Sequence, residues 1–223
     1  QFHPEVTHTN FGKNIIDNFL FGICLCKKSW TTKNIISDSI KNIKNTVKKK
    51  KVILALSGGV DSTVVAALLK KAINKQLTCI FIDTGLMRKN EVKEVNDNIS
   101  KKLGIRLITI NAQKTFFHKL KRVSSPERKR KIIGETFIRV FEQQSTKLKN
   151  VDFLAQGTIY PDVIESSSKD SKSDIIKSHH NVGGLPKNMK FDLIEPIREL
   201  FKDEVRKIGK SLGIPKPLLE RHP

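Results

Sequence analysis

A short glycine- and serine-rich segment, Ser57–Ser62, constrains the fold more than any other part of the chain. It follows the apolar run 52–56, which is short and rich in branched residues, as is typical of a buried parallel strand. It precedes residues 63–71, where apolar side chains recur at helical spacing and two lysines close the run. The pattern predicts a strand, a tight turn and a helix in direct succession.

This turn is a predicted anion site. Its two glycines let the backbone turn tightly and come close to a ligand. Ser57, Ser62 and the N–H groups of the first helical turn are expected to point at one spot, which suits a chain of phosphates. The segment lacks the Gly-Lys-Ser/Thr ending of a Walker A loop and the G-x-G-x-x-G of a dinucleotide fingerprint. An ordinary Gly-Ser turn is the alternative.

The rest of the chain alternates strand and helix patterns. Further apolar runs predict strands at 77–82, 106–110, 151–155 and 193–197, with helical patterns at 90–103 and over most of 114–150. Such alternation indicates right-handed βαβ units, and therefore an α/β fold with a doubly wound parallel sheet of about five strands. Asp83 ends the second strand, where ligands of such sheets lie, although an aspartate also commonly starts a turn.

The net charge of +20 is compatible with binding to RNA. The basic residues are scattered, however, and the one dense run, Lys48–Lys51, leads into the first strand. Because asparagine and isoleucine are also abundant, a general compositional bias explains the excess. We therefore expect no nucleic-acid partner.

Cysteine use and hydropathy bear on the cellular setting. No apolar run approaches the roughly 20 residues that a membrane helix needs, so we expect no membrane association. The three cysteines are unevenly placed, which fits a reducing cytoplasm. Cys24 and Cys26 have no second pair to complete a zinc site, and buried thiols are the prediction.

The Ser-Gly-Gly-Val-Asp-Ser segment resembles the pyrophosphate-binding loop of ATP pyrophosphatases. Those enzymes hold the β and γ phosphates of ATP while a substrate oxygen attacks the α phosphate, which gives an adenylated intermediate and pyrophosphate. Asp61 is expected to hold Mg²⁺ against the phosphates, whose charge must be neutralised as it shifts. The resemblance implies ATP binding by Ser57, Gly58, Gly59, Val60, Asp61, Ser62 and Thr63.

Two later segments carry a more specific resemblance. Residues 155–166 read Ala-Gln-Gly-Thr-Ile-Tyr-Pro-Asp-Val-Ile-Glu-Ser, and 176–186 read Ile-Lys-Ser-His-His-Asn-Val-Gly-Gly-Leu-Pro. Together they resemble the glutamine-hydrolysing GMP synthases. The resemblance implies an adenine nucleotide alpha hydrolase-like fold, ATP and Mg²⁺ as cofactors, and a homodimer. It also implies a reaction in which XMP O2 is adenylated and ammonia from glutamine then displaces AMP to give GMP.

The same resemblance implies roles for residues outside the loop. It implies nucleotide contacts at Ile82, Asp83, Leu86, Gly157 and Thr158, catalytic roles for Lys177, His179, His180 and Asn181, and substrate or lid contacts for Asp162, Glu165 and Lys202. Residues 166–174 are rich in Ser, Lys and Asp without periodicity, which predicts a mobile lid. A purely anchoring role for Asp162 and Glu165, and a structural role for Lys202, are the alternatives.

The N-terminal segment carries a different motif. Gln1-Phe2-His3-Pro4-Glu5-Val6 resembles the strand-end motif of class I glutamine amidotransferases, in which the glutamate orients the histidine of a Cys-His-Glu triad. Because the nucleophile of that family precedes the histidine, we expect His3 and Glu5 to be the remnant of a site. A surface histidine beside a proline is the alternative.

The expected domains follow from these motifs. Residues 1–26 are the expected remnant of a second α/β domain, the amidotransferase, and 27–50 a linker with an amphipathic helix. Residues 51–217 form the expected ATP pyrophosphatase domain, and 218–223 the start of a dimerisation domain. We expect this chain to carry mainly the adenylating half of the reaction and to show weak turnover of XMP, or none, on its own.

Two other functions compete with this hypothesis. One is a tRNA-modifying or NAD-forming ATP pyrophosphatase with the same loop. tRNA thiolation needs a cysteine near the nucleotide, and Cys79 lies within a predicted strand. NAD synthesis does not explain the segment 155–186 or the N-terminal motif. The other is a basic RNA-binding protein without catalysis.

Overall fold

The computed structural model describes residues 2–167 and 191–220. The chain divides into two compact units, residues 1–35 and 36–223, and each is described by itself. Within the described ranges, no helix is both long and apolar enough to cross a bilayer.

The smaller unit contains helix α1 (Gly12–Asp17) and the π-helical turn η1 (Asn18–Ile23). Gly12 lies directly against Pro4, because a Cβ at Gly12 would fall 2.1 Å from the Pro4 carbonyl oxygen. The prediction that Cys24 and Cys26 are buried is wrong, since both thiols are exposed. They follow the end of η1 in a stretch, residues 22–31, that is exposed without a break.

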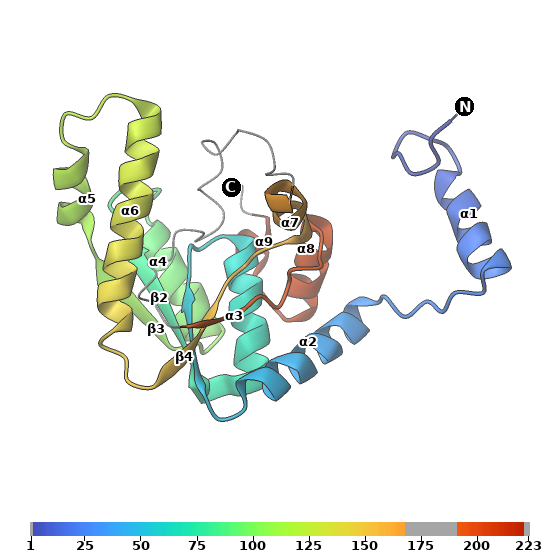
Figure 1. The fold of residues 1–223 in the computed structure, drawn as a ribbon, viewed down its shortest axis with the longest axis horizontal. Helices are drawn as coiled ribbons and strands as arrows, with labels where there is room; N and C mark the ends of the chain where they lie inside the picture. The colour runs from blue at the N-terminus through green and yellow to red at the C-terminus, as the bar shows by residue number, and fades with distance from the viewer. Residues whose placement is uncertain (1, 168–190, 221–223) are drawn as a thin grey trace. The chain divides into compact units, whose positions relative to one another are not determined.

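The larger unit is built on a five-stranded sheet in the order β3-β2-β1-β4-β5 (Figure 1). Every neighbouring pair is parallel. The strands are β1 (Lys51–Ala55), β2 (Leu77–Asp83), β3 (Leu107–Asn111), β4 (Val151–Ala155) and β5 (Asp192–Ile194). The predicted α/β class and five-stranded parallel sheet are therefore confirmed. The last strand ends before its predicted limit, because Pro196 has no N–H to continue the ladder and residues 196–199 form turns.

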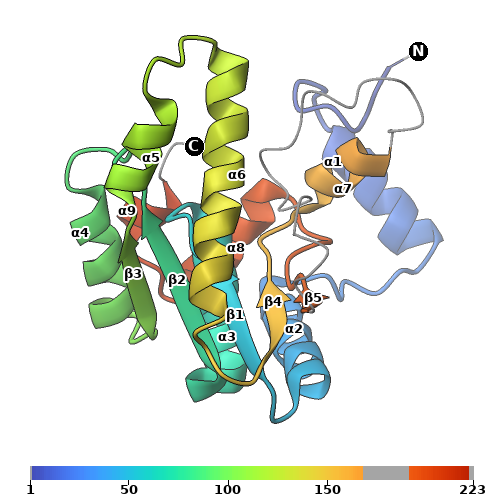
Figure 2. The same ribbon diagram turned by 60° about the vertical axis from the view of Figure 1, so that its left-hand side comes forward.

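Helices cover both faces of this sheet, as a doubly wound fold requires (Figure 2). The described helices after α1 are α2 (Thr32–Val47), α3 (Val60–Ile73), α4 (Glu91–Asn96), α5 (Gln113–Leu120), α6 (Pro126–Ser145), α7 (Tyr160–Ser167), α8 (Lys202–Ser211) and α9 (Lys216–Leu219), with a 3₁₀ turn η2 (Asn74–Gln76) and a π-helical turn η3 (Asp97–Lys102). On one face, Phe116 of α5 and Phe141 of α6 pack against Ile53 and Ile80 of the sheet. On the other, α3 packs against α8 and α9.

The sequence predicts a cap for two helices, within Trp30-Thr31-Thr32 at the start of α2 and at Asp203 for the start of α8. Thr31 caps α2 as predicted, because its hydroxyl accepts a hydrogen bond from the Asn34 N–H at 3.2 Å. The prediction that Asp203 caps α8 is wrong. The N-cap is Phe201, and the Glu204 carboxylate accepts a hydrogen bond from the Phe201 N–H at 2.8 Å. Asp203 instead lies in the first turn and forms an ion pair with Lys207 at 3.1 Å.

Candidate functional site

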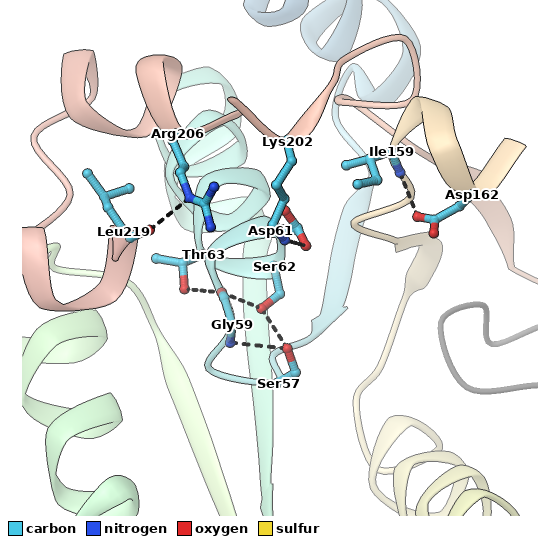
Figure 3. A network of polar contacts seen from close by, with 10 residues as sticks. All are labelled: Ser57, Gly59, Asp61, Ser62, Thr63, Ile159, Asp162, Lys202, Arg206 and Leu219. Atoms are coloured by element: carbon cyan, nitrogen blue, oxygen red, sulfur yellow. Dashed lines mark hydrogen bonds and ion pairs between the residues drawn. The ribbon is translucent and has the colours of Figure 1, made fainter. Parts of the chain in front are cut away.

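The segment that joins β1 to α3 forms a tight turn at the carboxyl edge of the sheet (Figure 3). Gly58 has a φ of 79°, a left-handed conformation that favours glycine. Gly59 caps α3 in an extended conformation, and its carbonyl oxygen accepts hydrogen bonds from the Thr63 N–H at 3.2 Å and the Thr63 hydroxyl at 2.8 Å. The Ser62 hydroxyl donates to the same carbonyl at 3.1 Å, so the turn is fixed by its own backbone and by the buried side chains of Ser62 and Thr63.

The two serines of the turn lie together. The Ser57 and Ser62 hydroxyl oxygens are 3.1 Å apart, and the Ser57 hydroxyl also accepts a hydrogen bond from the Gly59 N–H at 3.2 Å. Ser57 is exposed, whereas Val60 and Thr63 are buried beneath the turn. The side chains that the turn offers to a ligand are thus mainly hydroxyls, while Val60 and Thr63 hold it in place.

Asp61 lies in the first turn of α3 and forms an ion pair with Lys202, the first residue of α8, at 2.5 Å. Its other carboxylate oxygen, Oδ1, is buried and has no hydrogen-bond partner in the described part of the chain. A carboxylate oxygen is the donor that Mg²⁺ prefers, so Asp61 fits this ion. Residues 2–167 and 191–220 contain no group of three or more His, Cys, Asp or Glu side chains that could hold a metal. A single carboxylate is typical of Mg²⁺ bound mainly through substrate phosphates.

The loop after β4 lies directly on this turn. A Cβ at Gly157 would be 3.3 Å from both the Asp61 carbonyl carbon and the Ser62 nitrogen, so the absence of a side chain permits the close approach. Thr158 is buried, and its hydroxyl donates to the Glu195 carboxylate at 2.5 Å. Glu195 also pairs with Arg198. This loop is therefore packed between the turn and the segment that follows β5.

Two backbone hydrogen bonds tie the same loop to the segment before α8. The Gln156 N–H donates to the Ile194 carbonyl at 3.0 Å, and the Tyr160 N–H donates to the Leu200 carbonyl at 2.9 Å. The Tyr160 and Phe201 rings also meet edge to face, with centroids 5.3 Å apart. The segments that follow β1, β4 and β5 are distant in sequence, but they are thus connected at one edge of the sheet.

The side chains of the residues expected to contact the adenosine differ in burial and in hydrogen bonding. Ile82 is 1% exposed, and its side chain belongs to the core between the sheet and helices α5 and α6. Both carboxylate oxygens of Asp83 are used within the chain, because they accept hydrogen bonds from the Gly85 N–H at 2.9 Å and the Gln113 amide at 2.7 Å. Asp83 thus starts a turn, which was the alternative to nucleotide contact. Leu86, which is 48% exposed, presents an apolar side chain at this edge.

The remaining predicted residues lie on or beyond α7. The Asp162 carboxylate accepts a hydrogen bond from the Ile159 N–H at 3.0 Å, so it anchors the start of α7. Glu165 lies on the exposed surface of the same helix. Lys177, His179, His180 and Asn181, together with most of the expected lid, lie outside the described residues.

In the smaller unit, His3 and Glu5 form the contact that their motif predicts. The His3 Nδ1 and the Glu5 carboxylate are 2.8 Å apart, and both side chains are largely exposed. The His3 backbone is held by the Thr9 hydroxyl, which donates to the His3 carbonyl at 2.6 Å. The glutamate can therefore orient the imidazole, as the triad resemblance requires.

A cavity of about 420 Å³ lies at the opposite end of α3 from the Ser57–Ser62 turn. It is lined by Ala67, Lys70, Lys71, Asn74, Leu103, Ile105 and Leu212. The carbonyl end of α3 faces this region, so the helix dipole does not favour a phosphate there. The converging hydroxyls and the buried Asp61 oxygen make the turn the better candidate site.

The sequence reasoning missed Glu195 and Gln156. Glu195 holds the Thr158 hydroxyl, and the Gln156 Nε2 is a buried donor with no partner among the residues described. Gln156 directly follows β4, and Glu195 directly follows β5, at the carboxyl edge of the sheet. The strand-end rule that singled out Asp83 would have found Gln156 but not Glu195, which lies inside the predicted strand 193–197.

The cysteine inside the sheet is chemically inert. Cys79 lies in β2 and is fully buried, and this burial raises the pKa of its thiol to about 12. Since the thiolate is the nucleophilic form, Cys79 does not supply the cysteine that tRNA thiolation would need.

Comparison with known proteins agrees with the motifs. Residues 32–135 match the family model described as NAD synthase. Over its whole length the chain is 58% identical to a GMP synthase [glutamine-hydrolyzing] from Cellvibrio japonicus and 56% identical to one from Fusobacterium nucleatum. It covers 43% and 44% of the length of these two proteins.

Solved structures support the same fold. An NH3-dependent NAD synthetase from Campylobacter jejuni superposes with a TM-score of 0.64 at 17% identity, over 85% of this chain and 77% of the other. At that identity the likeness shows the fold alone, which is the adenine nucleotide alpha hydrolase-like fold that the motif resemblance implied. The chain is thus similar along its whole length to the glutamine-hydrolysing GMP synthases, and it spans less than half the length of each relative named above.

Proposed function

We propose that this chain carries the adenylating part of a glutamine-hydrolysing GMP synthase, a carbon–nitrogen ligase. In the proposed reaction, XMP O2 attacks the α phosphate of ATP, pyrophosphate leaves, and ammonia displaces AMP at the purine carbon to give GMP. The observation that supports it best is the Ser57–Ser62 turn, with two converging hydroxyls and a buried Asp61 oxygen, in a chain 58% identical to GMP synthases.

The proposed roles follow from the contacts of each residue. The Ser57 and Ser62 hydroxyls and the amides of the turn bind the β and γ phosphates. Asp61 holds Mg²⁺, which neutralises phosphate charge as pyrophosphate leaves. Lys202, whose ammonium lies at the Asp61 carboxylate, is close enough to the turn to contact the phosphates as well. Leu86 offers an apolar surface for the adenine.

Further roles rest on motif similarity and are proposed on that ground. Gly157 permits the approach of the loop after β4, and Thr158 contributes to its shape. The side chains of Ile82 and Asp83 are engaged elsewhere, and the Asp83 carbonyl accepts a hydrogen bond from the Ala112 N–H at 2.9 Å, so nucleotide contact at these two positions is proposed on the motif alone. Lys177, His179, His180 and Asn181 are proposed to act on the phosphates and the purine, with Asp162 and Glu165 at the base of their segment.

The same similarity extends the proposal to partners. XMP and glutamine-derived ammonia are the proposed substrates, and His3 and Glu5 are proposed members of a glutaminase triad. The domain limits at residues 26, 50 and 217, a homodimer involving residues from 218 onward, and a cytoplasmic setting are parts of the same proposal. NAD formation remains a second candidate, because residues 32–135 match the NAD synthase model.

Isothermal titration calorimetry of this chain with ATP in the presence of Mg²⁺ tests the first step. We expect saturable binding that Asp61→Asn weakens about tenfold or more, because the variant loses the negative charge on its metal ligand. Asp203→Asn is the matched control, since Asp203 is an exposed carboxylate that pairs with Lys207 on its own helix. Equal ATP affinity in wild type and Asp61→Asn would remove Asp61 from the metal site.

Substrate choice is tested separately. XMP is expected to stimulate release of pyrophosphate from ATP in the presence of ammonium, although only weakly with this chain on its own, whereas deamido-NAD is expected to have no effect. Stimulation by deamido-NAD alone would favour the NAD-forming candidate and contradict the GMP synthase proposal.

A further inference from the structure

The ion pair between Lys202 and Asp61 joins two elements that are far apart in sequence. Lys202 opens α8, whereas Asp61 lies in the first turn of α3, and their charged atoms are 2.5 Å apart (Figure 3). The two side chains are 38% and 27% exposed. Because the pair is partly withdrawn from water, its mutual attraction is expected to be stronger than that of the more exposed pair between Lys207 and Asp203, whose side chains are both 66% exposed.

This contact engages the carboxylate that fits a divalent cation. One Asp61 oxygen faces the Lys202 ammonium, and the other is buried without a hydrogen-bond partner in the residues described. A divalent cation that approached Asp61 in this state would meet a positive charge a few ångströms away. At that separation like charges repel by several times the thermal energy even at an effective dielectric constant of about 20. The ion pair therefore opposes metal binding at Asp61.

The backbone around Lys202 is fixed, but its ammonium is carried on a flexible stem. The Phe201 N–H is held by Glu204 at 2.8 Å, and the Leu200 carbonyl accepts the Tyr160 N–H at 2.9 Å. A lysine side chain has four methylene groups, so its ammonium can move to a new anion while the backbone stays in place. A triphosphate in the Ser57–Ser62 turn would be such an anion.

We propose that Lys202 acts as an internal cation that occupies Asp61 until a nucleotide triphosphate draws the ammonium away. Binding of a divalent cation at Asp61 is then conditional on the nucleotide, so the site does not fill with metal alone. The inference rests on the proposed function, because it takes the turn to be the triphosphate site. It goes further by giving the Lys202–Asp61 contact a role in the order of binding.

Mn²⁺ binding in the absence of any nucleotide tests the proposal. Titration calorimetry of the wild-type chain with Mn²⁺ is expected to show little binding, and Lys202→Met is expected to bind Mn²⁺ at least tenfold more tightly, because the repelling charge is gone. The double variant Lys202→Met with Asp61→Asn is expected to lose that gain. Lys207→Met is the matched control, since Lys207 lies on the same helix but pairs with Asp203.

Lys202→Arg keeps the positive charge and is expected to retain the weak Mn²⁺ binding of wild type. Circular dichroism shows whether the methionine variant is folded. If it is not, Lys202→Arg still supplies a folded comparison. Equal Mn²⁺ affinity in wild type, Lys202→Met and Lys202→Arg would overturn the proposal. This outcome is separate from a failure of the proposed function, which would appear as absent ATP binding by wild type with Mg²⁺ present.

Discussion

Gly157 illustrates how much a single residue contributes at the edge of this sheet. A Cβ at this position would lie 3.3 Å from backbone atoms of Asp61 and Ser62, so the loop after β4 passes directly against the turn after β1. The sequence motif marked Gly157 as a nucleotide contact. The structure adds a packing reason for the glycine, because any larger residue would push against backbone atoms that cannot rotate away.

Gly157→Ala is expected to lower ATP affinity several-fold with little change in melting temperature. The new Cβ would lie 3.3 Å from the Asp61 carbonyl carbon and the Ser62 nitrogen, so the turn must shift by a few tenths of an ångström. Calorimetry and thermal melting measure the two effects. Gly134→Ala is the control, because a Cβ there meets nothing within 4 Å, and wild-type ATP affinity is expected. Unchanged affinity in Gly157→Ala would show that the turn tolerates displacement.

Cys79 gives a second prediction at this scale. The thiol has a pKa of about 12 in the folded chain against 9.0 when unperturbed, so on raising the pH the unfolded chain releases its proton first. The free energy of unfolding should therefore fall as the pH rises from 9 towards 12, and Cys79→Ala should show less of this fall. Denaturant titrations at pH 8 and 10 would measure the difference. An equal fall in both proteins would exclude Cys79 as its source.

At the scale of helices and strands, sequence periodicity located the elements well. The strands β1 to β4 lie within one residue of their predicted limits, because each is a short apolar run that ends at polar or turn residues. The start of α8 was misplaced, since Asp203 and Glu204 are both acidic and only the fold determines which one reaches back to the helix start. Periodicity also placed Ile82 at a strand end without revealing that its side chain faces α5 and α6.

The contact between α3 and α8 depends on another glycine. A Cβ at Gly209 would lie 2.5 Å from Leu219 Cδ2 and 3.0 Å from Val64 Cγ2. Gly209→Ala is therefore expected to lower the free energy of unfolding by about 1–3 kcal/mol, as overpacking of a tight core usually does. Denaturant unfolding measures it, with Gly134→Ala as a helical control that should be neutral or slightly stabilising. A loss of stability no larger than in the control would mean that α3 and α8 can move apart without a cost in free energy.

At the scale of the whole molecule, the sequence predicted the layered α/β fold because strand and helix patterns alternate along most of the larger unit. It could not predict which strand ends are bonded to one another. The link between Thr158 and Glu195 spans 37 residues, and that between Lys202 and Asp61 spans 141. Such pairs depend on the strand order β3-β2-β1-β4-β5, which no local pattern contains. The burial of Cys24 and Cys26 was mispredicted for a related reason, since residue type alone does not say what packs on a segment.

The central place of β1 has a consequence for how the protein opens. This strand is flanked by β2 and β4, so its amides are bonded to one neighbour or the other and the whole strand is released only when both ladders break, whereas β5 has one neighbour and is three residues long. In native-state hydrogen exchange, the β1 amides should report the global free energy of unfolding. The β5 amides should exchange through local openings that have a lower free energy. Exchange of β1 at the rate of β5 would contradict this. The turn that follows β1 is thereby anchored to the most cooperative part of the chain, so fraying at the edge of the sheet leaves its anchor intact.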